Sequence, residues 1–156
     1  MVNALINQKL SVDVPDGYTV LSADQLQEMY RDTNTDRWGM RNESAHHTAA
    51  VFYHKSNPLL AAIADVKGIA ESTQKKLAAG LSAYSYQLKG FYPAEVCGRK
   101  AYGFSYSYVN QGIPTDGETL IFKDGSTCYT VYSYSRNENS AANHSVFEAI
   151  LASMKL

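Results

Sequence analysis

The spacing of apolar and polar residues predicts strands and helices that alternate along the chain. Apolar and polar residues alternate from Lys9 to Val14, which is typical of a strand with one buried face. The next residues, Pro15-Asp16-Gly17, favour a tight turn, because proline presets one dihedral angle and glycine accepts positive φ. Ser22 then stands three residues before Gln25, a capping-box arrangement that predicts a helix over about 23–31.

A long polar segment follows this helix and carries the single tryptophan, Trp38. We expect residues 32–45 to form a loop, and long loops inside compact domains are often functional. Two strands are predicted next, at residues 48–54 and 59–66. Pro58 lies between them, and we expect it to end the first ladder and start a turn.

The second half of the chain is predominantly β in pattern. A helix is expected first, over residues 70–82, because this segment is rich in alanine, lysine and leucine. Aromatic and β-branched residues then predict strands at 84–88, 92–96, 101–109, 118–123 and 127–135. Asp124-Gly125 indicates a hairpin between the last two strands.

The chain closes with a predicted helix over about 141–154. Its apolar stripe consists of Val146, Phe147, Ile150, Leu151 and Met154. The order of elements predicts an α+β fold in one domain covering residues 1–156. We expect an α/β/α sandwich in which helices pack on a mostly antiparallel central sheet.

The segment from Ala101 to Val109, AYGFSYSYV, carries an aromatic residue at every second position. In a strand, Tyr102, Phe104, Tyr106 and Tyr108 share one face, and the small residues between them share the other. Tyrosine pairs recur in other predicted strands, at Tyr84 and Tyr86 and at Tyr132 and Tyr134.

This tyrosine pattern has two interpretations, which the sequence leaves open. One is a buried core whose hydroxyls reach its edge. The other is a partly open aromatic groove. The chain has twelve tyrosines and five phenylalanines. Because each buried phenol needs a hydrogen-bond partner, this surplus favours a surface that is apolar on one side and wet on the other.

Composition and charge exclude several classes of partner. Apolar residues make up 45% of the chain, charged residues 19%, and the net charge is -1, as in ordinary globular domains. Nucleic-acid binding is disfavoured, because the lysines are scattered and form no basic stretch. No window is long and apolar enough to span a membrane. The first residues lack a secretory signal, so we expect a cytoplasmic protein, with a trimmed leader as the alternative.

Motifs for catalysis are missing from the sequence. We find no GxSxG elbow, no phosphate-binding glycine loop and no zinc-ligand spacing around His46, His47, His54 or His144. We therefore expect no catalytic residues and no cofactor. Cys97 and Cys128 are expected to be free thiols, with a cross-strand disulfide as the alternative.

The sharpest local match is to a calcium-binding loop, in which oxygen ligands occupy positions 1, 3, 5 and 12. Asp32, Asn34, Asp36 and Glu43 have this spacing after a predicted helix. Arg37 occupies the sixth position, where such a loop needs glycine, and a strand rather than a helix is predicted after Glu43. The four oxygen ligands are therefore candidates only, and an Asx-rich loop is the other interpretation.

Four segments together resemble the PsbP-like family, also called the MOG-one/PsbP-like fold, in its bacterial branch of unknown function. They are LSVDVPDGYTVLS, CGRKAYGFSYSY, TLIFKDGSTCYTVYSYS and VFEAILASMKL. The resemblance implies a single α/β/α sandwich. It also implies a role in binding or assembly, since the family includes a photosystem subunit, a Ran-binding transport factor, lipoproteins and chaperones of secreted effectors.

We therefore predict a non-enzymatic binding, adaptor or chaperone-like protein that holds a peptide or protein segment. The expected contact residues are Tyr102, Tyr106, Tyr108, Tyr132, Tyr134 and Trp38. One alternative is a small-molecule or metal-binding enzyme that uses the 32–47 segment, including Asp32, Asp36, Glu43 and His46 or His47. Another is a purely structural subunit of a larger assembly, which would present a large flat apolar patch.

Overall fold

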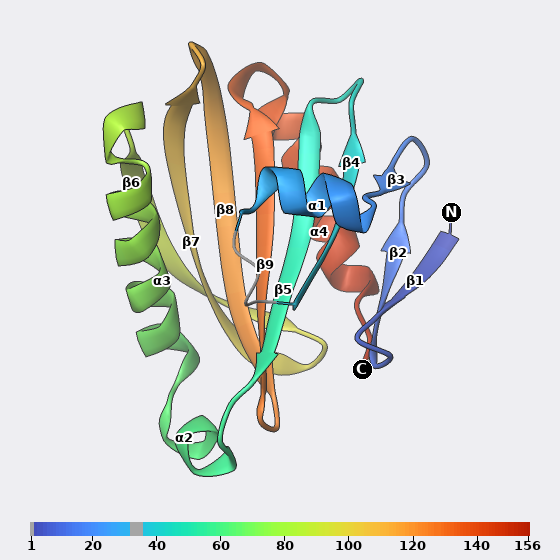
Figure 1. The fold of residues 1–156 in the computed structure, drawn as a ribbon, viewed down its shortest axis with the longest axis vertical. Coiled ribbons are helices and arrows are strands. Elements are labelled where there is room, and N and C mark those ends of the chain that lie inside the picture. The colour runs from blue at the N-terminus through green and yellow to red at the C-terminus, as the bar shows by residue number, and fades with distance from the viewer. Residues whose placement is uncertain (1, 32–35) are drawn as a thin grey trace.

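The computed structural model describes residues 2–31 and 36–156, and its centre is a seven-stranded sheet (Figure 1). The strand order is β3-β4-β5-β9-β8-β7-β6, and every neighbouring pair is antiparallel. In that order the strands are β3 (Thr19–Val20), β4 (Asp36–Asn42), β5 (His47–Lys55), β9 (Thr127–Arg136), β8 (Ile113–Asp124), β7 (Arg99–Asn110) and β6 (Gln87–Val96).

Helices cover both faces of this sheet (Figure 1). One face carries α1 (Ala23–Met29) and α3 (Val66–Gly80). The other carries α4 (Ser140–Ser153) and a separate hairpin of β1 (Val2–Ile6) and β2 (Leu10–Val14). The remaining elements are α2 (Pro58–Ile63) and two 3₁₀ turns, η1 (Ser82–Tyr84) and η2 (Asn137–Asn139). The predicted α+β sandwich with a mostly antiparallel sheet is confirmed. The strand predicted at residues 9–14 is β2, whereas its partner β1 was not predicted.

Each face of the sheet has its own apolar core. The larger core lies between the sheet, α4 and the hairpin, where Phe147 and Ile150 meet Leu10, Val12 and Val131. The smaller core lies under α3, where Ala70 packs over buried side chains of β7, β8 and β9: Phe104, Tyr106, Ile121 and Cys128. Burial of each large apolar side chain contributes roughly 1.5–3 kcal/mol, so both layers are fixed to the sheet by packing.

The helix signals in the sequence are confirmed, with shifted boundaries. At the start of α1, the Ser22 hydroxyl accepts the Gln25 N–H at 3.2 Å, and the Gln25 side chain accepts the Ser22 N–H at 2.8 Å. The middle helix begins at Val66 rather than residue 70. Its cap is the Asp65 carboxylate, which accepts the Gly68 N–H at 2.7 Å.

The strand predicted at residues 59–66 is wrong, because α2 and the start of α3 occupy this segment. Asn57 caps α2 by accepting the Leu59 N–H at 2.9 Å. Pro58 sits in the first turn, where its missing N–H costs no hydrogen bond. Asn-Pro thus starts a helix here rather than ending a strand.

The loop predicted at residues 32–45 is also wrong over much of its length. Asp36–Asn42 forms β4, which pairs with β5 from Asp36 opposite Tyr53 to Asn42 opposite His47. The polar composition hid this strand, because its ladder is set by β5 rather than by its own side chains.

Two further strand boundaries differ from the prediction. The strands expected at 84–88 and 92–96 are one strand, β6, with a bulge between Leu88 and Gly90. Tyr84 belongs to η1 instead. The hairpin predicted at Asp124-Gly125 is confirmed, although Asp124 pairs with Thr127, so Gly125 and Ser126 form the turn. Gly125 has φ +59°, the conformation that favours glycine.

The hairpin at the start of the chain is tied to the end of α4. Ser11 and Lys155 exchange two backbone hydrogen bonds, at 2.8 and 3.0 Å. The Ser153 hydroxyl also accepts the Asp13 N–H at 3.0 Å. These contacts hold the buried face of β2 against α4.

Cys97 and Cys128 are free thiols, as expected, and the alternative disulfide is not formed. Among residues 2–31 and 36–156, no helix is long and apolar enough to cross a bilayer.

Candidate functional site

The register of the sheet brings the predicted tyrosines to one face. Tyr106 of β7 lies opposite Gly117 of β8, which in turn lies opposite Tyr134 of β9. Residues two apart along a strand share a face, so Tyr102, Phe104, Tyr106, Tyr108, Tyr132 and Tyr134 all point to the side that carries α1 and α3. We call this side the tyrosine face.

Helix α3 covers the part of the tyrosine face that β7 and β8 form. Phe104 and Tyr106 are fully buried in the core beneath Ala70. The Tyr106 hydroxyl pairs with the Thr119 hydroxyl at 3.3 Å, and burial raises the pKa of the Tyr106 phenol. The prediction that Tyr106 contacts a partner is therefore wrong. Its phenol has an internal partner, and the core interpretation holds for this part of the face.

Tyr102 lies on the outer side of α3. Its ring stacks on Phe91, with ring centroids 6.0 Å apart, and the Lys67 ammonium lies 6.0 Å from its centre. The shallow pocket there is lined by Tyr102, Phe91 and outward residues of α3 such as Lys75. Tyr102 is thus separated from Tyr132 and Tyr134 by the helix.

The rest of the tyrosine face is partly open. Tyr132 and Tyr134 stack with their centroids 5.9 Å apart, and Tyr108 stacks on the edge of the buried cluster, 6.2 Å from Tyr106. Burial raises the pKa of both Tyr108 and Tyr132 to about 12. These phenols stay protonated at neutral pH, so each offers a hydrogen-bond donor at the rim of an apolar surface.

Aromatic contacts connect this open part to α1. Tyr30, at the end of α1, packs edge to face on Phe52 of β5 at 4.8 Å. Phe52 in turn packs against Tyr132 at 5.2 Å. Leu21 and Leu26 hold α1 close to the sheet, because Gly39 of β4 leaves room for both side chains. The position of α1 on the sheet is therefore set by side-chain packing.

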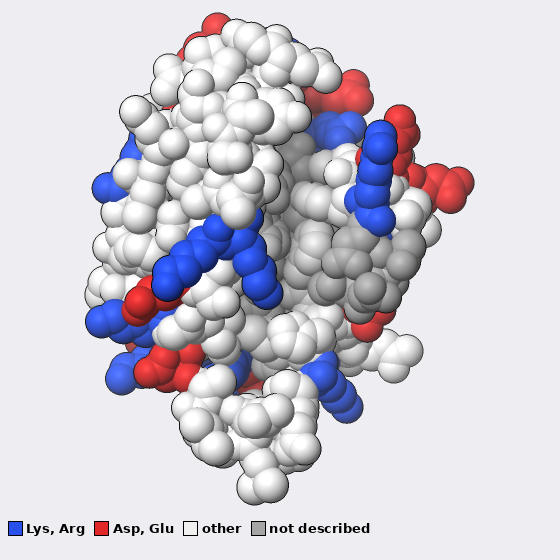
Figure 2. All heavy atoms as spheres, turned by 60° about the vertical axis from the view of Figure 1, so that its left-hand side comes forward, with Lys and Arg blue, Asp and Glu red and all other residues white. Residues whose placement is uncertain are grey.

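A cleft runs between α3 and the α1 side of this face, and Figure 2 shows it down the middle of the view. Its lower part is a hollow of about 590 Å³. One wall consists of residues along a single side of α3, and the floor includes His54, Cys128 and Thr130. A second, upper hollow of about 480 Å³ lies at the far ends of the strands, lined by Tyr108, Tyr134 and neighbouring residues. It shares no lining residue with the lower hollow, and Tyr132 stands between the two on β9.

Trp38 lies on the opposite face of the sheet. It is in β4 directly across from Val51, and both pack on the core under α4. The prediction that Trp38 joins the tyrosines in one binding surface is therefore wrong. Its assignment to a loop concealed the alternation that places it on the other side.

The two candidate calcium ligands within the described residues, Asp36 and Glu43, do not come together. Asp32 and Asn34 lie outside the described residues. Asp36 and Glu43 stand at opposite ends of β4, about 20 Å apart at the usual rise per residue of a strand. Two carboxylates so far apart cannot coordinate one ion, so the loop interpretation of this segment is wrong.

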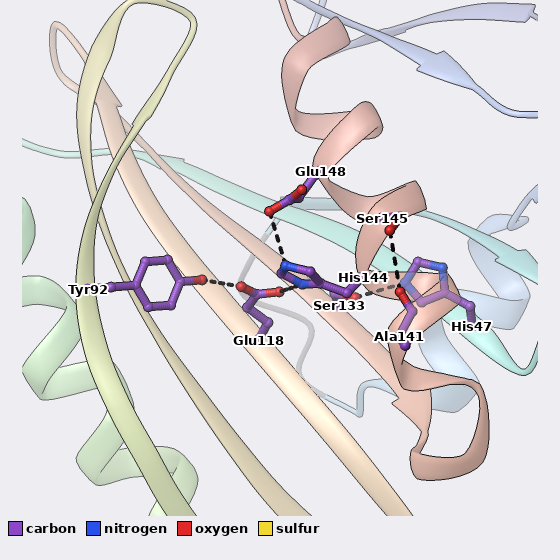
Figure 3. A network of polar contacts seen from close by, with 8 residues as sticks. All are labelled: His47, Tyr92, Glu118, Ser133, Ala141, His144, Ser145 and Glu148. Carbon is purple, nitrogen blue, oxygen red and sulfur yellow. Dashed lines mark hydrogen bonds and ion pairs between the residues drawn. The ribbon is translucent and has the colours of Figure 1, made fainter.

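Sequence reasoning missed a polar network on the face under α4 (Figure 3). His47 is buried, its Nδ1 lies 2.5 Å from the Tyr18 hydroxyl, and its Nε2 lies 2.8 Å from the Ser133 hydroxyl. Burial lowers the pKa of His47 to about 4, so the imidazole is neutral at pH 7. His46, its neighbour in sequence, sits in the preceding turn with φ +53° and takes no part in these bonds.

The second part of this network connects β6, β8 and α4 (Figure 3). The Tyr92 hydroxyl donates to Glu118 at 2.5 Å. His144 lies between two carboxylates, with Nδ1 3.2 Å from Glu118 and Nε2 3.0 Å from Glu148. Only the i,i+4 spacing of His144 and Glu148 is visible in the sequence. The other contacts depend on strand register.

Ser133 and His47 have the pairing of a nucleophile and a base, but their surroundings oppose acyl transfer. Ser133 is buried, and Glu118 stands directly across the ladder on the same face. The reaction develops negative charge beside the nucleophile and needs hydrogen-bond donors there, whereas a carboxylate repels that charge. The network therefore fits a structural role.

The comparisons with known proteins concern the fold. No protein-family model matches the sequence, and no curated protein matches it in sequence. The architecture is an α+β sandwich in which α1 and α3 lie on one side of an antiparallel sheet and α4 lies on the other. Solved structures identify that class as the PsbP-like fold, which also includes Mog1p.

Three of the similar structures illustrate the likeness. Cyanobacterial PsbP (CyanoP) from Synechocystis sp. PCC 6803 has a TM-score of 0.74 at 10% identity, over 99% of this chain and 91% of that one. The Ran-binding protein Mog1p of Saccharomyces cerevisiae has a TM-score of 0.55 at 11% identity, over 94% and 84%. LpqN, involved in cell envelope biogenesis of Mycobacterium tuberculosis, has 0.52 at 12% identity, over 94% and 82%.

These identities show the fold alone. The family resemblance in the sequence is thereby confirmed at the level of fold.

Proposed function

We propose that this chain is a non-enzymatic binding protein that holds an extended segment of a partner protein in the cleft of the tyrosine face. The observation that carries the proposal is the stacked pair Tyr132 and Tyr134, which is partly exposed and of which Tyr134 lines the upper hollow. Such rings offer a flat apolar surface with a polar edge, which suits a peptide backbone as well as apolar side chains. Mog1p, which shares the fold, is a Ran-binding protein.

The dimensions of the cleft favour an extended segment. Its floor follows β9 from Cys128 in the lower hollow to Arg136 in the upper one. Nine strand residues span roughly 25 Å, so the cleft has room for about seven or eight residues in extended form.

Charge around the cleft favours an acidic segment. Arg41 and Arg136 line the upper hollow, and Lys76 lines the lower one. Glu43 and Asp65 also line these hollows, so the basic excess is modest. In Figure 2, lysine and arginine side chains reach toward the cleft from its left wall. We expect charge to contribute orientation and association rate more than affinity.

Site-specific crosslinking tests the proposal. A photoreactive benzoylphenylalanine replaces Tyr132, which stands on β9 between the two hollows, and in a control protein it replaces Tyr84, which is 48% exposed and lies in η1. We expect a discrete partner crosslink from the first position alone. Mass spectrometry of that product identifies the contacted segment, which is then synthesised as a peptide.

Calorimetry with this peptide completes the test. We expect Tyr132→Ala to weaken binding by at least tenfold, since truncation of an aromatic anchor typically costs about 2 kcal/mol or more. Lys76→Glu should also weaken binding, whereas Lys75→Glu should not, because Lys75 faces away from the cleft on the same helix. Equal crosslinking from both positions, or unchanged affinity of folded Tyr132→Ala, would overturn the proposal.

A further inference from the structure

Helix α2 projects from the lower end of the molecule and exposes an unusual amount of aliphatic surface (Figure 1). Leu59, Leu60 and Ile63 are 75%, 63% and 80% exposed. The buried position in this six-residue helix is Ala61. Exposed aliphatic residues are ordinary when scattered singly, but a contiguous group at the tip of a molecule indicates an interaction surface.

The helix is anchored to the sheet at its base. The Lys123 ammonium donates to the carbonyl of Ala61 at 2.7 Å and also to that of Ala64. The backbone N–H of Ser56 donates to Ser126 in the β8–β9 turn at 2.9 Å. The three aliphatic side chains are therefore presented on a fixed, convex support, and the lower end of Figure 2 shows this projection as a white lobe.

Basic residues surround the projection. Lys55 precedes α2, Lys67 follows it in α3, and both are exposed. The acidic Asp124 of the neighbouring hairpin is neutralised by two partners, since it pairs with Lys9 and with Arg99 at 2.8 Å. Lys123 also lies against α2, so Lys55, Lys67 and Lys123 outnumber Asp65 at this end, and Lys9 and Arg99 outnumber Asp124. Asp65 is engaged in capping α3.

We propose that α2 docks the protein on an anionic lipid surface. Leu59, Leu60 and Ile63 would enter the boundary between headgroups and acyl chains, and Lys55 and Lys67 would contact the headgroups. Apolar burial combined with attraction between lysines and anionic lipids is the general basis of interfacial binding. A convex tip with basic flanks is complementary to a flat, negatively charged surface, and this charge complementarity distinguishes the lipid from a second copy of the chain.

The docking surface is separable from the cleft. Ile63 borders the lower hollow, but Leu59 and Leu60 do not line it. Substitutions at Leu59 or Leu60 therefore test the lipid surface without altering the walls of the cleft. The protein on a membrane would hold its cleft beside the lipid with the long axis of the molecule directed away from it.

Vesicle flotation tests this inference. The full chain is mixed with vesicles of phosphatidylcholine and phosphatidylglycerol in equal parts, and with vesicles of phosphatidylcholine alone. We expect the protein to float with the anionic vesicles and to be released as salt rises, because lysine contacts with anionic headgroups are screened. Leu60→Asp should reduce the bound fraction by roughly tenfold or more, since a charge then replaces a buried aliphatic side chain.

The matched control is Val20→Asp, at a residue of β3 that is 49% exposed and lies away from α2. It should leave flotation unchanged. No flotation of the wild-type chain with anionic vesicles, or equal flotation of Leu60→Asp, would overturn the proposal. Lipid-free sedimentation velocity provides a second check, because a dimer that Leu60→Asp dissociates would show that another copy of the chain, and not lipid, covers α2.

Discussion

The ring of Tyr106 occupies the space that a side chain at Gly117 would need. The two residues stand opposite each other on β7 and β8, and a methyl group at position 117 would lie 2.3 Å from the Cε2 atom of the tyrosine. This contact fixes the buried ring of Tyr106 on the sheet, beside the partly exposed pair Tyr132 and Tyr134. The glycine is thus part of the architecture of the tyrosine face.

Gly117→Ala should lower the free energy of unfolding by roughly 1–3 kcal/mol, the usual range for overpacking a core. Denaturant melts measure the change. Gly90→Ala is the control, because a methyl group there meets nothing within 4 Å. Equal stability of the two variants would contradict the close approach of Tyr106 and Gly117.

Truncation of tyrosines should distinguish the sealed part of the face from the open part. Tyr106→Ala removes a fully buried ring and should cost about 3–5 kcal/mol. Tyr108→Ala removes a partly exposed ring and should cost less, while affecting binding in the cleft. Denaturant melts on both variants give the comparison. If both changes cost the same several kcal/mol, the region around Tyr108 is interior and the cleft does not extend to it.

The buried imidazole of His47 should make stability depend on pH. Its pKa is about 4 in the folded protein, against an ordinary value of 6.5, so the unfolded chain binds more protons between these values. Stability from this group is fully present above pH 6.5 and decreases as pH falls toward 4. The full difference is of order 3 kcal/mol.

His47→Gln isolates this contribution. The variant should be less stable at pH 7, since its bonds with Tyr18 and Ser133 are altered, but it should lose less stability than the wild-type chain between pH 6.5 and 4. Thermal or denaturant melts across this range give both slopes. Parallel slopes for the two proteins would show that His47 is not the titrating group.

The short hydrogen bond from Tyr92 to Glu118 should contribute more to the free energy of unfolding than the contact between His144 and Glu148 on α4. Tyr92→Phe removes a donor to a mostly buried carboxylate and should cost about 1.5 kcal/mol. Glu148→Gln alters a contact whose glutamate is 68% exposed, and it should change stability by about 0.5 kcal/mol or less. The reverse order in chemical melts would contradict this reading of the network.

The sequence predicted those elements whose own residues carry a local signal, such as a capping pair or a regular apolar spacing. The Ser22 and Gln25 pair predicted α1, the alternating aromatics predicted β7, and the apolar stripe that includes Phe147 predicted α4. From these elements the sandwich and its antiparallel sheet followed. The PsbP-like resemblance agreed with them.

Elements stabilised by distant partners were not predictable in this way. Strand β4 is polar along its length and owes its place to pairing with β5, so Trp38 was assigned to a loop and to the wrong face. The alternating pattern correctly predicted that these tyrosines share one face of the sheet. It could not show that α3 covers Tyr106 and leaves Tyr132 accessible, because this depends on how the helix packs. The bonds of His47 join residues 29 and 86 positions away, which no local pattern reveals.

The exchange of backbone bonds between Ser11 and Lys155 has a consequence for biosynthesis. A ribosome makes Leu10 and Val12 long before α4, which covers them in the larger core. Until α4 has been made, the apolar face of β2 is uncovered in the nascent chain, and chaperones shield surfaces of this kind. Folding of this layer is therefore completed only after α4 has been translated.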